Sequence, residues 1–571
     1  MSKLETAINE FRQTQLGVYK VDPGRIVSDA GDAESVTRDH VGRWLFELLQ
    51  NCDDAKSRNV KIVIADDAVY LADKGKGLEL GAISAICSTH RSNKPSDTIG
   101  RKGVGFKSVY NVSEHVQVFA VNEGGIDFSP DKTKTWLNDN GFKDEHVPYQ
   151  SVPFFIPWDE EDCVLNTLKD FKTIVALRNV SNEQQERVRQ LLEEWPPHAL
   201  FSFRHLRKIE APELEIHISP GRDIWKLRDS RENIADKWRI TKHNENAPEA
   251  VLKPLNVDER KAVTQDGVSF LIAAPVEKQL VIPTDAYLPV HVFYPTEEKG
   301  PVRLLLHAEF VVKSDRTTLV PISSNDFNRW VSDRLAFHVC EFVNSAYKQN
   351  CPSAHIALLT PFEDKSSHPV AEALWQCIAE QAKAHLKMAD EEGVQRLTVR
   401  EAAQIKVSVR PDLARKVLAG TRARSKLLHQ TFDDDTDAQK ALDAMGCDEI
   451  KDEEVFGIIE ANAESRATDF NWIWACWEWL AAWVEEKDWR RKERIETVSR
   501  LPIVPMGGLL QRPSQLFGRI VTWRADSEVE SLPEWLPLNY VDDWFRDRIA
   551  DSKKQEDDYD EYIVKLTGDL N

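Results

Sequence analysis

The chain has 571 residues, of which 42% are hydrophobic and 29% are charged, and its formal net charge is −20. A chain of this length exceeds a single hydrophobic core, and a prior of about 150 residues per domain predicts three or four units. The absence of any uninterrupted apolar run of about 18 residues excludes a helical membrane anchor, so no membrane partner is expected. The net negative charge does not favour general nucleic-acid binding, although it does not exclude a local basic groove that binds nucleic acid.

The N-terminal stretch and the cysteines of the chain predict a cytoplasmic protein. The N-terminal stretch MSKLETAINEFRQTQ is a polar helical pattern without the apolar region of a signal peptide. Eight cysteines occur without a C-x-x-C pair, which argues against a zinc site and against a disulfide framework. The acidic runs at 432–437 and 553–562 are expected to be solvated loops or mobile ends. The last residues, LTGDLN, show no evident closing element, which leaves open that the chain is part of a longer protein.

The stretch FELLQNCDDAKSRN at 46–59 reads as an amphipathic helix with an unusual polar edge. At roughly 100° per residue, Glu47, Asn51 and Asp54 form one stripe, whereas Asp53 points elsewhere. A second, apolar stripe has the same periodicity and consists of Val41, Leu45, Leu48, Cys52 and Ala55. An isolated trio of this kind is more often the solvated side of a surface helix. The polar stripe therefore indicates a functional site only in combination with the motifs downstream of it.

The residues up to 195 predict an α+β domain. Two β-rich runs at 60–65 and 68–73, separated by Asp66 and Asp67, read as a hairpin. The segment at 78–99 has a second half rich in Ser, Asn, Lys and Pro, as expected of a mobile cover. Further strands are expected at 115–121 and 170–178, and a helix at 182–195.

The remaining chain is expected to form a second α+β domain at 196–350 and a mainly helical region at 351–571. The predicted strands of the second domain are LEIHIS, RDIWKL, SFLIAAPV, LPVHVFYP and VRLLLHAEFVV, and a helix at 325–348 closes it. The helical region contains FNWIWACWEWLAAWVEEKDW at 470–489, which is apolar on nearly all sides. Buried core is the favoured reason, and a contact with a partner is the alternative.

Three separated segments of the sequence together contain the residue types that bind a nucleoside triphosphate. Asp73, at the end of a hairpin strand and followed by Gly75 and Gly77, could accept a hydrogen bond from the exocyclic amine of adenine. The second glycine cluster, GRKGVG, contains Gly100, Gly103 and Gly105 with Arg101 and Lys102, and its backbone N–H groups could approach phosphates. An asparagine oxygen such as that of Asn51 can complete the ligand shell of Mg²⁺, and a glutamate such as Glu47 can deprotonate water.

Two other phosphate motifs fail by one residue each. GRKGVGFKS would match the P-loop pattern G-x-x-x-x-G-K-[ST] except that Phe106 separates Gly105 from Lys107. A dinucleotide-binding G-x-G-x-x-G beginning at Gly75 would require a glycine at position 80, which is Leu80.

The segments ELLQNCDDA, DKGKG and TIGRKGVGFKSVY resemble the N box and the two glycine boxes of the GHKL ATPases, the group of gyrase, the ninety-kilodalton heat-shock chaperone, histidine kinases and MutL. The likeness is strongest to the sacsin N-terminal branch, whose N box reads ELLQNADDA. The order and spacing of all three motifs match over about 60 residues. This resemblance implies an α+β fold whose residues 1–195 form a Bergerat-type sandwich of helices on a mixed sheet, with ATP and Mg²⁺ as cofactors.

By motif position, the resemblance also implies residue roles. Glu47 would be the general base, Asn51 the magnesium ligand and Asp54 a nucleotide contact. Asp73 would bind the adenine amine, Gly75 and Gly77 would line the base, and residues 78–99 would form the lid. The phosphate loop would consist of Gly100, Arg101, Lys102, Gly103, Val104, Gly105 and Phe106. Thr173 stands where the family has a threonine that supports adenine through water. The glycine that usually precedes this threonine in the family is absent here, so the role of Thr173 follows less directly from the resemblance than the roles of the other residues.

The likeness continues more faintly at LPVHVFYPTEE and LLLHAEFVVKSDRTTL. In GHKL enzymes a basic residue from a following domain reaches the γ-phosphate, and Lys313 or Arg316 could serve here. The equally weighted alternative is that KSDR is simply a polar loop.

The leading hypothesis is a slow, magnesium-dependent ATPase that switches conformation, with a homodimer formed through the ATPase domain and an unidentified protein client or partner. A chaperone-like role or a role in bacterial defence or stress follows only by analogy. The alternatives are an ATP-binding scaffold with little hydrolysis and a histidine kinase. The kinase is disfavoured because its only nearby phosphoacceptor candidate, His40, lies at the start of the N-box helix.

Overall fold

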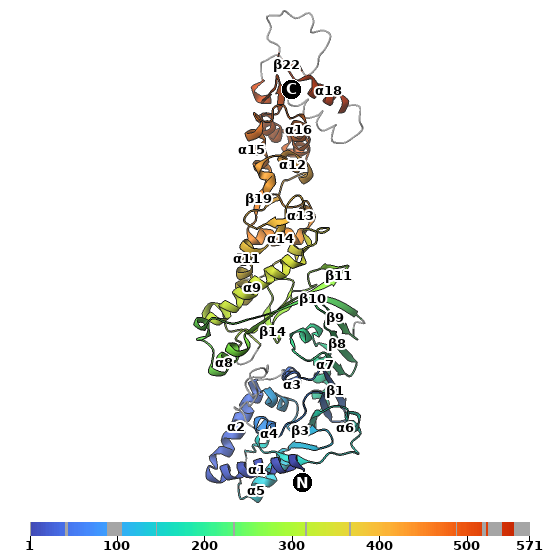
Figure 1. The fold of residues 1–571 in the computed structure, drawn as a ribbon, viewed down its shortest axis with the longest axis vertical. Helices are drawn as coiled ribbons and strands as arrows, with labels where there is room; N and C mark the ends of the chain where they lie inside the picture. Colours follow the sequence, from blue (N-terminus) through green and yellow to red (C-terminus); the bar gives the residue numbers. More distant parts are fainter. Residues whose placement is uncertain are drawn as a thin grey trace, which may run out of the picture. The chain divides into compact units, whose positions relative to one another are not determined.

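The computed structural model describes residues 2–39, 44–87, 105–143, 146–231, 234–313, 317–364, 367–486, 488–516, 521–522 and 539–552 (Figure 1). The chain divides into two compact units, the first comprising Met1–Phe342 with Phe362–Ile378 and the second Val343–Pro361 with Ala379–Asn571. The division into domains at 195 and 350 stays a prediction.

The first unit begins with the elements that carry the N-terminal motifs. They are α1 (Lys3–Val21), α2 (Gly24–Asp39), α3 (Trp44–Asp54), β1 (Asn59–Ala65), β2 (Ala68–Asp73), α4 (Ala82–Cys87), η1 (Gly105–Asn111), β3 (His115–Ala120), β4 (Gly124–Phe128), α5 (Pro130–Asp139), η2 (Tyr149–Ser151), β5 (Phe154–Ile156), α6 (Cys163–Thr167), β6 (Thr173–Arg178) and α7 (Asn182–Glu193).

The first unit continues with a longer β region. Its elements are η3 (Pro197–Ser202), β7 (Lys208–Ala211), β8 (Leu214–Ser219), β9 (Ile224–Asp229), β10 (Ile234–Glu245), η4 (Glu249–Leu252), α8 (Val257–Asp266), β11 (Val268–Glu277), β12 (Leu280–Val281), β13 (Pro289–Val292), β14 (Tyr294–Lys299), β15 (Leu305–Ala308), η5 (Ile322–Ser324) and α9 (Asp326–Ala346), whose last residues belong to the second unit.

The remaining elements are mainly helical, as predicted for this part of the chain. They are α10 (Ala354–Ala357), α11 (Pro369–His385), β16 (Met388–Ala389), β17 (Gln395–Leu397), β18 (Ala403–Ile405), α12 (Pro411–Leu418), η7 (Arg422–Lys426), α13 (Thr431–Asp434), α14 (Thr436–Met445), β19 (Asp448–Ile450), α15 (Asp452–Asn462), α16 (Phe470–Glu485), η8 (Asp488–Arg490), α17 (Arg491–Ser499), β20 (Val504–Met506), β21 (Leu509–Gln511), η9 (Pro513–Gln515), β22 (Val521–Thr522), β23 (Asn539–Tyr540) and α18 (Asp543–Ser552).

One mixed sheet runs through the described part of the first unit in the order β14-β13-β15-β11-β10-β9-β8-β7-β1-β2-β6-β3-β4-β5. Its N-terminal half, β1–β6, and its C-terminal half, β7–β15, meet where β1 pairs in parallel with β7, with Val60 opposite Ile209. The two halves therefore share one hydrogen-bonded sheet and one hydrophobic core.

The predicted hairpin that presents Asp73 is confirmed. In β1 and β2, Ala65 pairs with Ala68, which leaves Asp66 and Asp67 as a two-residue turn. Asp66 has a φ of +50°, a left-handed conformation that aspartate tolerates in hairpin turns. Every residue of β2 is buried, because β1 and β6 pair with both of its edges and its alternating side chains pack into hydrophobic clusters on both faces of the sheet. The strand therefore delivers Asp73 at its end with little freedom to move.

The helix α9 packs over the C-terminal half of the sheet (Figure 1). Trp330 on α9 lies edge-on to Phe270 on β11, with 6.3 Å between the ring centroids. Arg334 forms a bidentate ion pair with Glu245 on β10, at 2.6 and 2.7 Å. The predicted helix at 325–348 is thus confirmed, and both apolar and charged contacts hold it to the strands.

In the second unit, the tryptophan-rich helix α16 is core, as predicted. Its five tryptophans are buried, and four of their indole N–H groups have partners inside the unit. Those of Trp472, Trp477 and Trp479 donate to backbone carbonyls, and that of Trp483 donates to the Asp452 carboxylate. Each of these four indoles therefore satisfies its single donor, which is the condition for burying tryptophan without penalty.

The acidic run at 432–437 is not the solvated loop that the sequence predicts. It contains α13 and the start of α14. Asp433 forms a bidentate ion pair with Arg415 at 2.8 and 2.9 Å, and the Asp435 carboxylate accepts the backbone N–H of Ala438 as an N-cap. The run at 553–562 lies outside the described residues.

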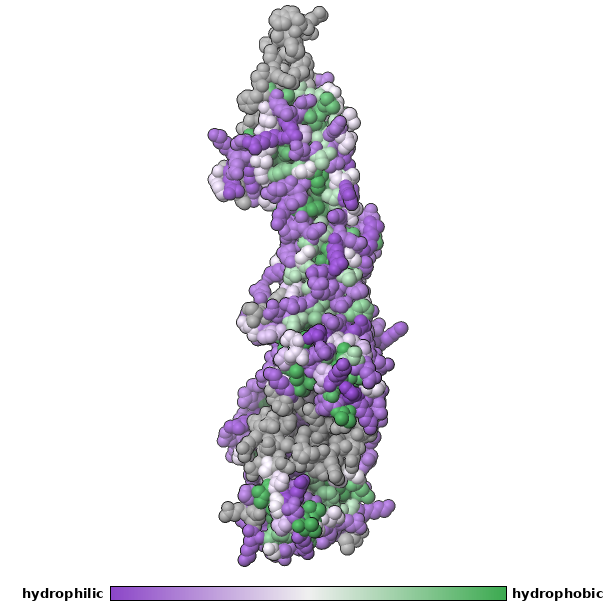
Figure 2. Space-filling view, turned by 90° about the vertical axis from the view of Figure 1, so that its left-hand side faces the viewer, coloured by the Kyte–Doolittle hydropathy of each residue, from purple (hydrophilic) through white to green (hydrophobic). Residues whose placement is uncertain are grey.

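On the face drawn in Figure 2, the described side chains are mainly hydrophilic, and the apolar ones lie in small scattered groups. None of the described helices combines the length and apolarity that crossing a bilayer requires. All eight cysteines are free thiols.

Candidate nucleotide site

The helix α3 carries the predicted polar stripe. Glu47 on its first turn is only 3% exposed, and Asn51 and Asp54 are half-buried. The apolar stripe is buried at Leu45, Leu48 and Cys52, while Ala55 lies just past the end of the helix and Val41 lies outside the described residues.

The end of α3 meets the turn that follows Asp73. The backbone N–H of Lys76 donates to the carbonyl of Ala55 at 2.9 Å, and that of Lys74 donates to the Ser57 hydroxyl at 2.9 Å. The body of α3 packs against η1, the segment that follows the second glycine cluster. The turn after Asp73 therefore contacts the residues just past the end of α3, and η1 lies against the helix itself.

Asp73 is a buried carboxylate held by two donors. It is 6% exposed, its Oδ1 accepts the backbone N–H of Gly75 at 2.6 Å, and it hydrogen-bonds the hydroxyl of Thr173, its neighbour on β6. Burial raises the pKa of Asp73 to about 6, although both hydrogen bonds act in the opposite direction. A carboxylate kept rigid and short of water at a strand end is well suited to accept a hydrogen bond from an amine of a ligand.

The two glycines after Asp73 have separate steric reasons. A Cβ on Gly75 would lie 2.6 Å from the carbonyl oxygen of Ala55 and 2.7 Å from Asp73 Oδ1, distances that no real Cβ tolerates. Gly77 has a φ of +88°, where an L side chain is strained. Residues with side chains would therefore push this turn away from α3.

Most of the predicted phosphate loop lies outside the described residues. This holds for Gly100, Arg101, Lys102, Gly103 and Val104, and for the part of the predicted lid at 88–99. Gly105 and Phe106 are described as the start of η1, and Phe106 packs against the main core. The remainder of the predicted lid, 78–87, contains the short helix α4.

Lys107 is a feature that the sequence does not reveal. It is fully buried in η1, its Nζ donates to the carbonyl oxygen of Gln150, and it lies 5.9 Å from the ring centroid of Tyr110. Burial lowers the pKa of Lys107 to about 8. In the sequence Lys107 is only the lysine that Phe106 separates from Gly105, which breaks the P-loop match, and its burial depends on tertiary structure.

Of the two basic residues predicted to reach the γ-phosphate, Arg316 lies outside the described residues. Lys313 is exposed at the base of a small hairpin, where its backbone N–H donates to the carbonyl of Thr318 at 2.9 Å. The Asn328 side chain on α9 bonds both backbone groups of Val311 and the carbonyl of Val320, which fixes both sides of this hairpin.

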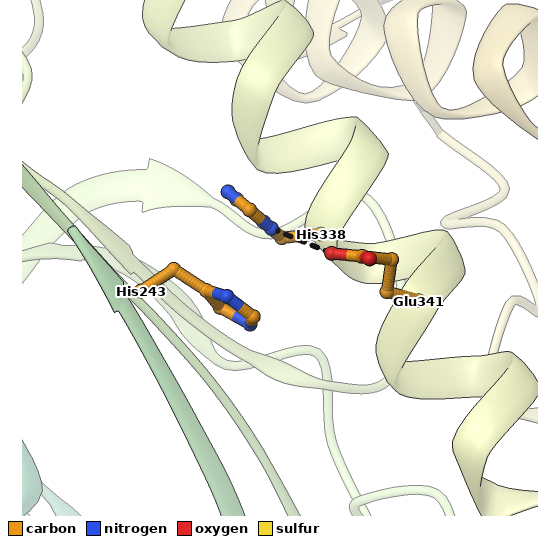
Figure 3. A group of neighbouring side chains, drawn as sticks. All are labelled: His243, His338 and Glu341. Carbon is orange, nitrogen blue, oxygen red and sulfur yellow. Dashed lines mark hydrogen bonds and ion pairs between the residues drawn. The ribbon is translucent and has the colours of Figure 1, made fainter. Parts of the chain in front are cut away.

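One group of described side chains has the composition of a metal site: His243 on β10 with His338 and Glu341 on α9 (Figure 3). Both ring nitrogens of His338 already face carboxylates, Nε2 at 2.7 Å from Glu245 and Nδ1 at 3.0 Å from Glu341. The two imidazoles stack with centroids 3.9 Å apart and planes at 14°. Because imidazole offers its lone pair in the ring plane, two parallel stacked rings do not converge on one ion. The group therefore serves to join α9 to β10.

Comparison with known proteins agrees with the motifs. A family model described as a histidine kinase-, DNA gyrase B- and HSP90-like ATPase matches residues 41–140. No curated protein matches the chain. Among solved structures, the N-terminal domain of a DNA repair protein is similar at 12% identity with a TM-score of 0.29, over 56% of this chain and 98% of that chain. This likeness is too low for the name of that protein to bear on this one.

The matched segment includes α3, the Asp73 turn and the second glycine cluster, and a domain of this kind implies that ATP is its ligand. Residues 41–140 are a GHKL-type ATPase domain of the histidine kinase-, DNA gyrase B- and HSP90-like family.

Proposed function

We propose that the first unit binds ATP with Mg²⁺, hydrolyses it slowly and uses the nucleotide state to change conformation. The observation that carries this proposal is the buried Asp73 carboxylate, held at the end of β2 by Gly75 and Thr173 inside a GHKL-type domain. In this proposal the Asp73 carboxylate accepts a hydrogen bond from the exocyclic amine of adenine, and guanine has no amine at the same position. Gly75 and Gly77 let the base approach, and Thr173 supports the site through a water molecule.

The polar stripe of α3 supplies the groups for hydrolysis. Asn51 would hold the magnesium ion, Asp54 would contact the nucleotide, and magnesium, when bound, neutralises charge on the phosphate oxygens. Glu47, one helical turn before Asn51, would orient the attacking water and accept its proton. Its burial supports this role, because a shielded carboxylate keeps a fixed orientation and competes less with bulk water.

The remaining predicted roles complete the proposal. Gly100, Arg101, Lys102, Gly103, Val104, Gly105 and Phe106 would surround the phosphates. Lys313 or Arg316 would reach the γ-phosphate and so report nucleotide state to the C-terminal half of the sheet. A sacsin-like, chaperone-like or defence role, a homodimer, an unidentified protein partner or client, and a cytoplasmic location of the protein belong to the same proposal. The second candidate function is a scaffold that binds ATP without turnover, and the presence of Glu47 favours hydrolysis over it.

Phosphate release by the full chain tests this function. We expect release that requires both ATP and Mg²⁺ and that stops when the metal is chelated. Glu47→Ala should abolish release while ATP still binds. Glu183→Ala removes a glutamate that is 76% exposed on α7 and serves as the matched control with unchanged release. Tight ATP binding by the wild type without any release would favour the scaffold, and release by Glu47→Ala at the wild-type rate would overturn the role of Glu47.

A further inference from the structure

The helix α3 carries a second stripe that the nucleotide does not explain. Phe46, Gln50 and Asp53 follow the same i, i+4, i+7 spacing as the first stripe, one residue earlier along the chain. This offset turns the second stripe by roughly 100° around the helix axis. Whatever the first stripe binds, the second one faces another part of the protein.

Asp53 holds the beginning of the C-terminal half of the sheet. It is 1% exposed, and its carboxylate accepts the backbone N–H groups of Arg204, His205 and Leu206 at 3.1, 2.6 and 2.7 Å. These three residues lie between η3 and β7, about 150 positions away in the sequence. Three charge-assisted bonds to one buried carboxylate are a strong and direction-specific link.

Phe46 and Gln50 contact the first strand residue of β14. The Tyr294 hydroxyl donates to Gln50 Oε1 and lies 3.2 Å from the carbonyl oxygen of Phe46. The Phe46 ring packs between Tyr294 and Trp195, with centroid distances of 5.0 and 4.1 Å. All of these contacts lie within the first unit.

The link continues toward the hairpin that carries Lys313. The guanidinium of Arg204, whose backbone is held by Asp53, lies 3.9 Å from the carboxylate of the buried Glu309. Glu309 directly follows β15 and precedes the segment that Asn328 fixes at Val311. Named contacts thus connect α3 with the base of the Lys313 hairpin.

We propose that α3 is a second route, besides Lys313 or Arg316, by which nucleotide state reaches the C-terminal half of the sheet, with Phe46, Gln50 and Asp53 as the positioning residues. This inference rests on the proposed function, because the first stripe must contact nucleotide for α3 to respond. A helix moves as a rigid body, so a displacement that the first stripe favours is imposed on Arg204–Leu206 and Tyr294 through the second stripe. The neighbouring residues Asp53 and Asp54 therefore have different roles. Asp53 links α3 to the C-terminal half of the sheet, and Asp54 contacts the nucleotide.

The experiment measures backbone hydrogen exchange in 305–313 of the full chain, with and without magnesium and a non-hydrolysable ATP analogue, alongside the affinity for that analogue. This reporter segment makes no bond to Asp53. In the wild type we expect the analogue to change exchange there by about fivefold or more, the lower range of allosteric coupling. Asp53→Asn places an amide among three N–H donors and should reduce that change to less than about twofold, while affinity stays within about threefold.

Two further variants separate linkage from simple loss of stability. Tyr294→Phe removes only the hydroxyl that bonds Gln50 and should weaken the change in exchange without loss of folding. Asp127→Asn removes another fully buried carboxylate, whose partners His115, Gln117 and Lys132 lie away from the second stripe, and should leave the change intact.

The inference is overturned if Asp53→Asn keeps the wild-type change, if Asp127→Asn loses it equally, or if the wild type binds the analogue without any change in 305–313. Failure of the proposed function is recognised separately, because the wild type would then show no affinity for the analogue.

Discussion

Asp73 and Thr173 face each other across β2 and β6, and the hydroxyl of Thr173 hydrogen-bonds the Asp73 carboxylate. The sequence separates these residues by a hundred positions, and the sheet joins them at the end of a fully buried strand. The proposed site depends on this pair, because it fixes a carboxylate where a base with an exocyclic amine would be read.

ATP affinity should therefore depend on pH around the pKa of Asp73, which burial raises to about 6. Protonation below this pH removes charge from the acceptor, so we expect affinity to fall by up to about tenfold per pH unit below 6. Calorimetric titration with ATP between about pH 5 and pH 7.5 measures this. A pH-independent affinity across this range would show that ionised Asp73 does not contact the ligand.

In the nucleotide-free protein, the ionised carboxylate of Asp73 should lower the free energy of unfolding. Because the folded-state pKa of Asp73 lies above its ordinary value of 3.8, its contribution to stability is present below pH 3.8 and is lost as the pH rises through 6. Asp73→Asn should then stabilise the nucleotide-free protein at neutral pH by up to about 3 kcal/mol. Thermal unfolding without nucleotide checks the sign, and a lower melting temperature for the variant would contradict it.

Gly75→Ala should disrupt the turn beside α3. The added Cβ would lie 2.6 Å from the Ala55 carbonyl, so the turn must shift, and we expect a loss of about 1–3 kcal/mol in unfolding free energy together with weakened ATP binding. The control is Gly17→Ala on the exposed side of α1, where a Cβ meets nothing within 4 Å. That control should stabilise the protein by about 0.5–1 kcal/mol. Equal effects of both changes in denaturant titrations would argue against a tight turn at Gly75.

Three buried histidines should make the first unit sensitive to acid. Burial lowers the pKa of His198 to about 4, that of His307 to about 3 and that of His291 well below its ordinary value. Since the unfolded chain takes up these protons near pH 6.5, stability is fully present above that pH and falls as the pH drops toward 3, by about 1.4 kcal/mol per pH unit for each histidine. Unfolding followed from about pH 7.5 to pH 4 should show this loss, and His291→Gln should reduce its slope.

The second unit should depend on Trp477. This side chain is fully buried and its Nε1 donates to the carbonyl of Ile503 at 2.9 Å, so Trp477→Ala should destabilise the unit by about 3–5 kcal/mol. Trp489 is 77% exposed, and Trp489→Ala should change stability by less than about 0.5 kcal/mol. Tryptophan fluorescence during denaturation compares the two variants, and similar midpoints would contradict a packed tryptophan core.

Local patterns in the sequence predict the elements of the site well. The hairpin with Asp66 at its turn follows from alternating β-rich residues and turn chemistry, and α3 follows from the periodicity around Glu47. The buried tryptophans of α16 follow from an apolar surface on all sides of one helix. These features are local, because the residues that specify them are within a few turns of one another.

The features that the sequence does not reveal depend on distant partners. From the sequence, Asp53 is only the neighbour of Asp54 that points away from the polar stripe, and its partners become known when the chain at Arg204 folds against it. The parallel pairing of β1 with β7, which joins the two halves of the sheet, likewise has no local signature. Asp433, in an apparently solvated acidic run, is instead an ion-pair partner of Arg415. Sequence patterns specify which residues are polar, whereas tertiary structure decides what each polar residue contacts.

The proposed mechanism depends most directly on Asp73 reading a nucleotide base beside α3. Calorimetric titration of wild type, Asp73→Asn and Glu47→Ala with ATP and GTP in the presence of Mg²⁺ tests it. We predict that the wild type prefers ATP, that Asp73→Asn loses about tenfold or more in ATP affinity, and that Glu47→Ala binds ATP within about threefold of the wild type. Wild-type affinity and base preference in Asp73→Asn would contradict this role of Asp73 and the mechanism with it.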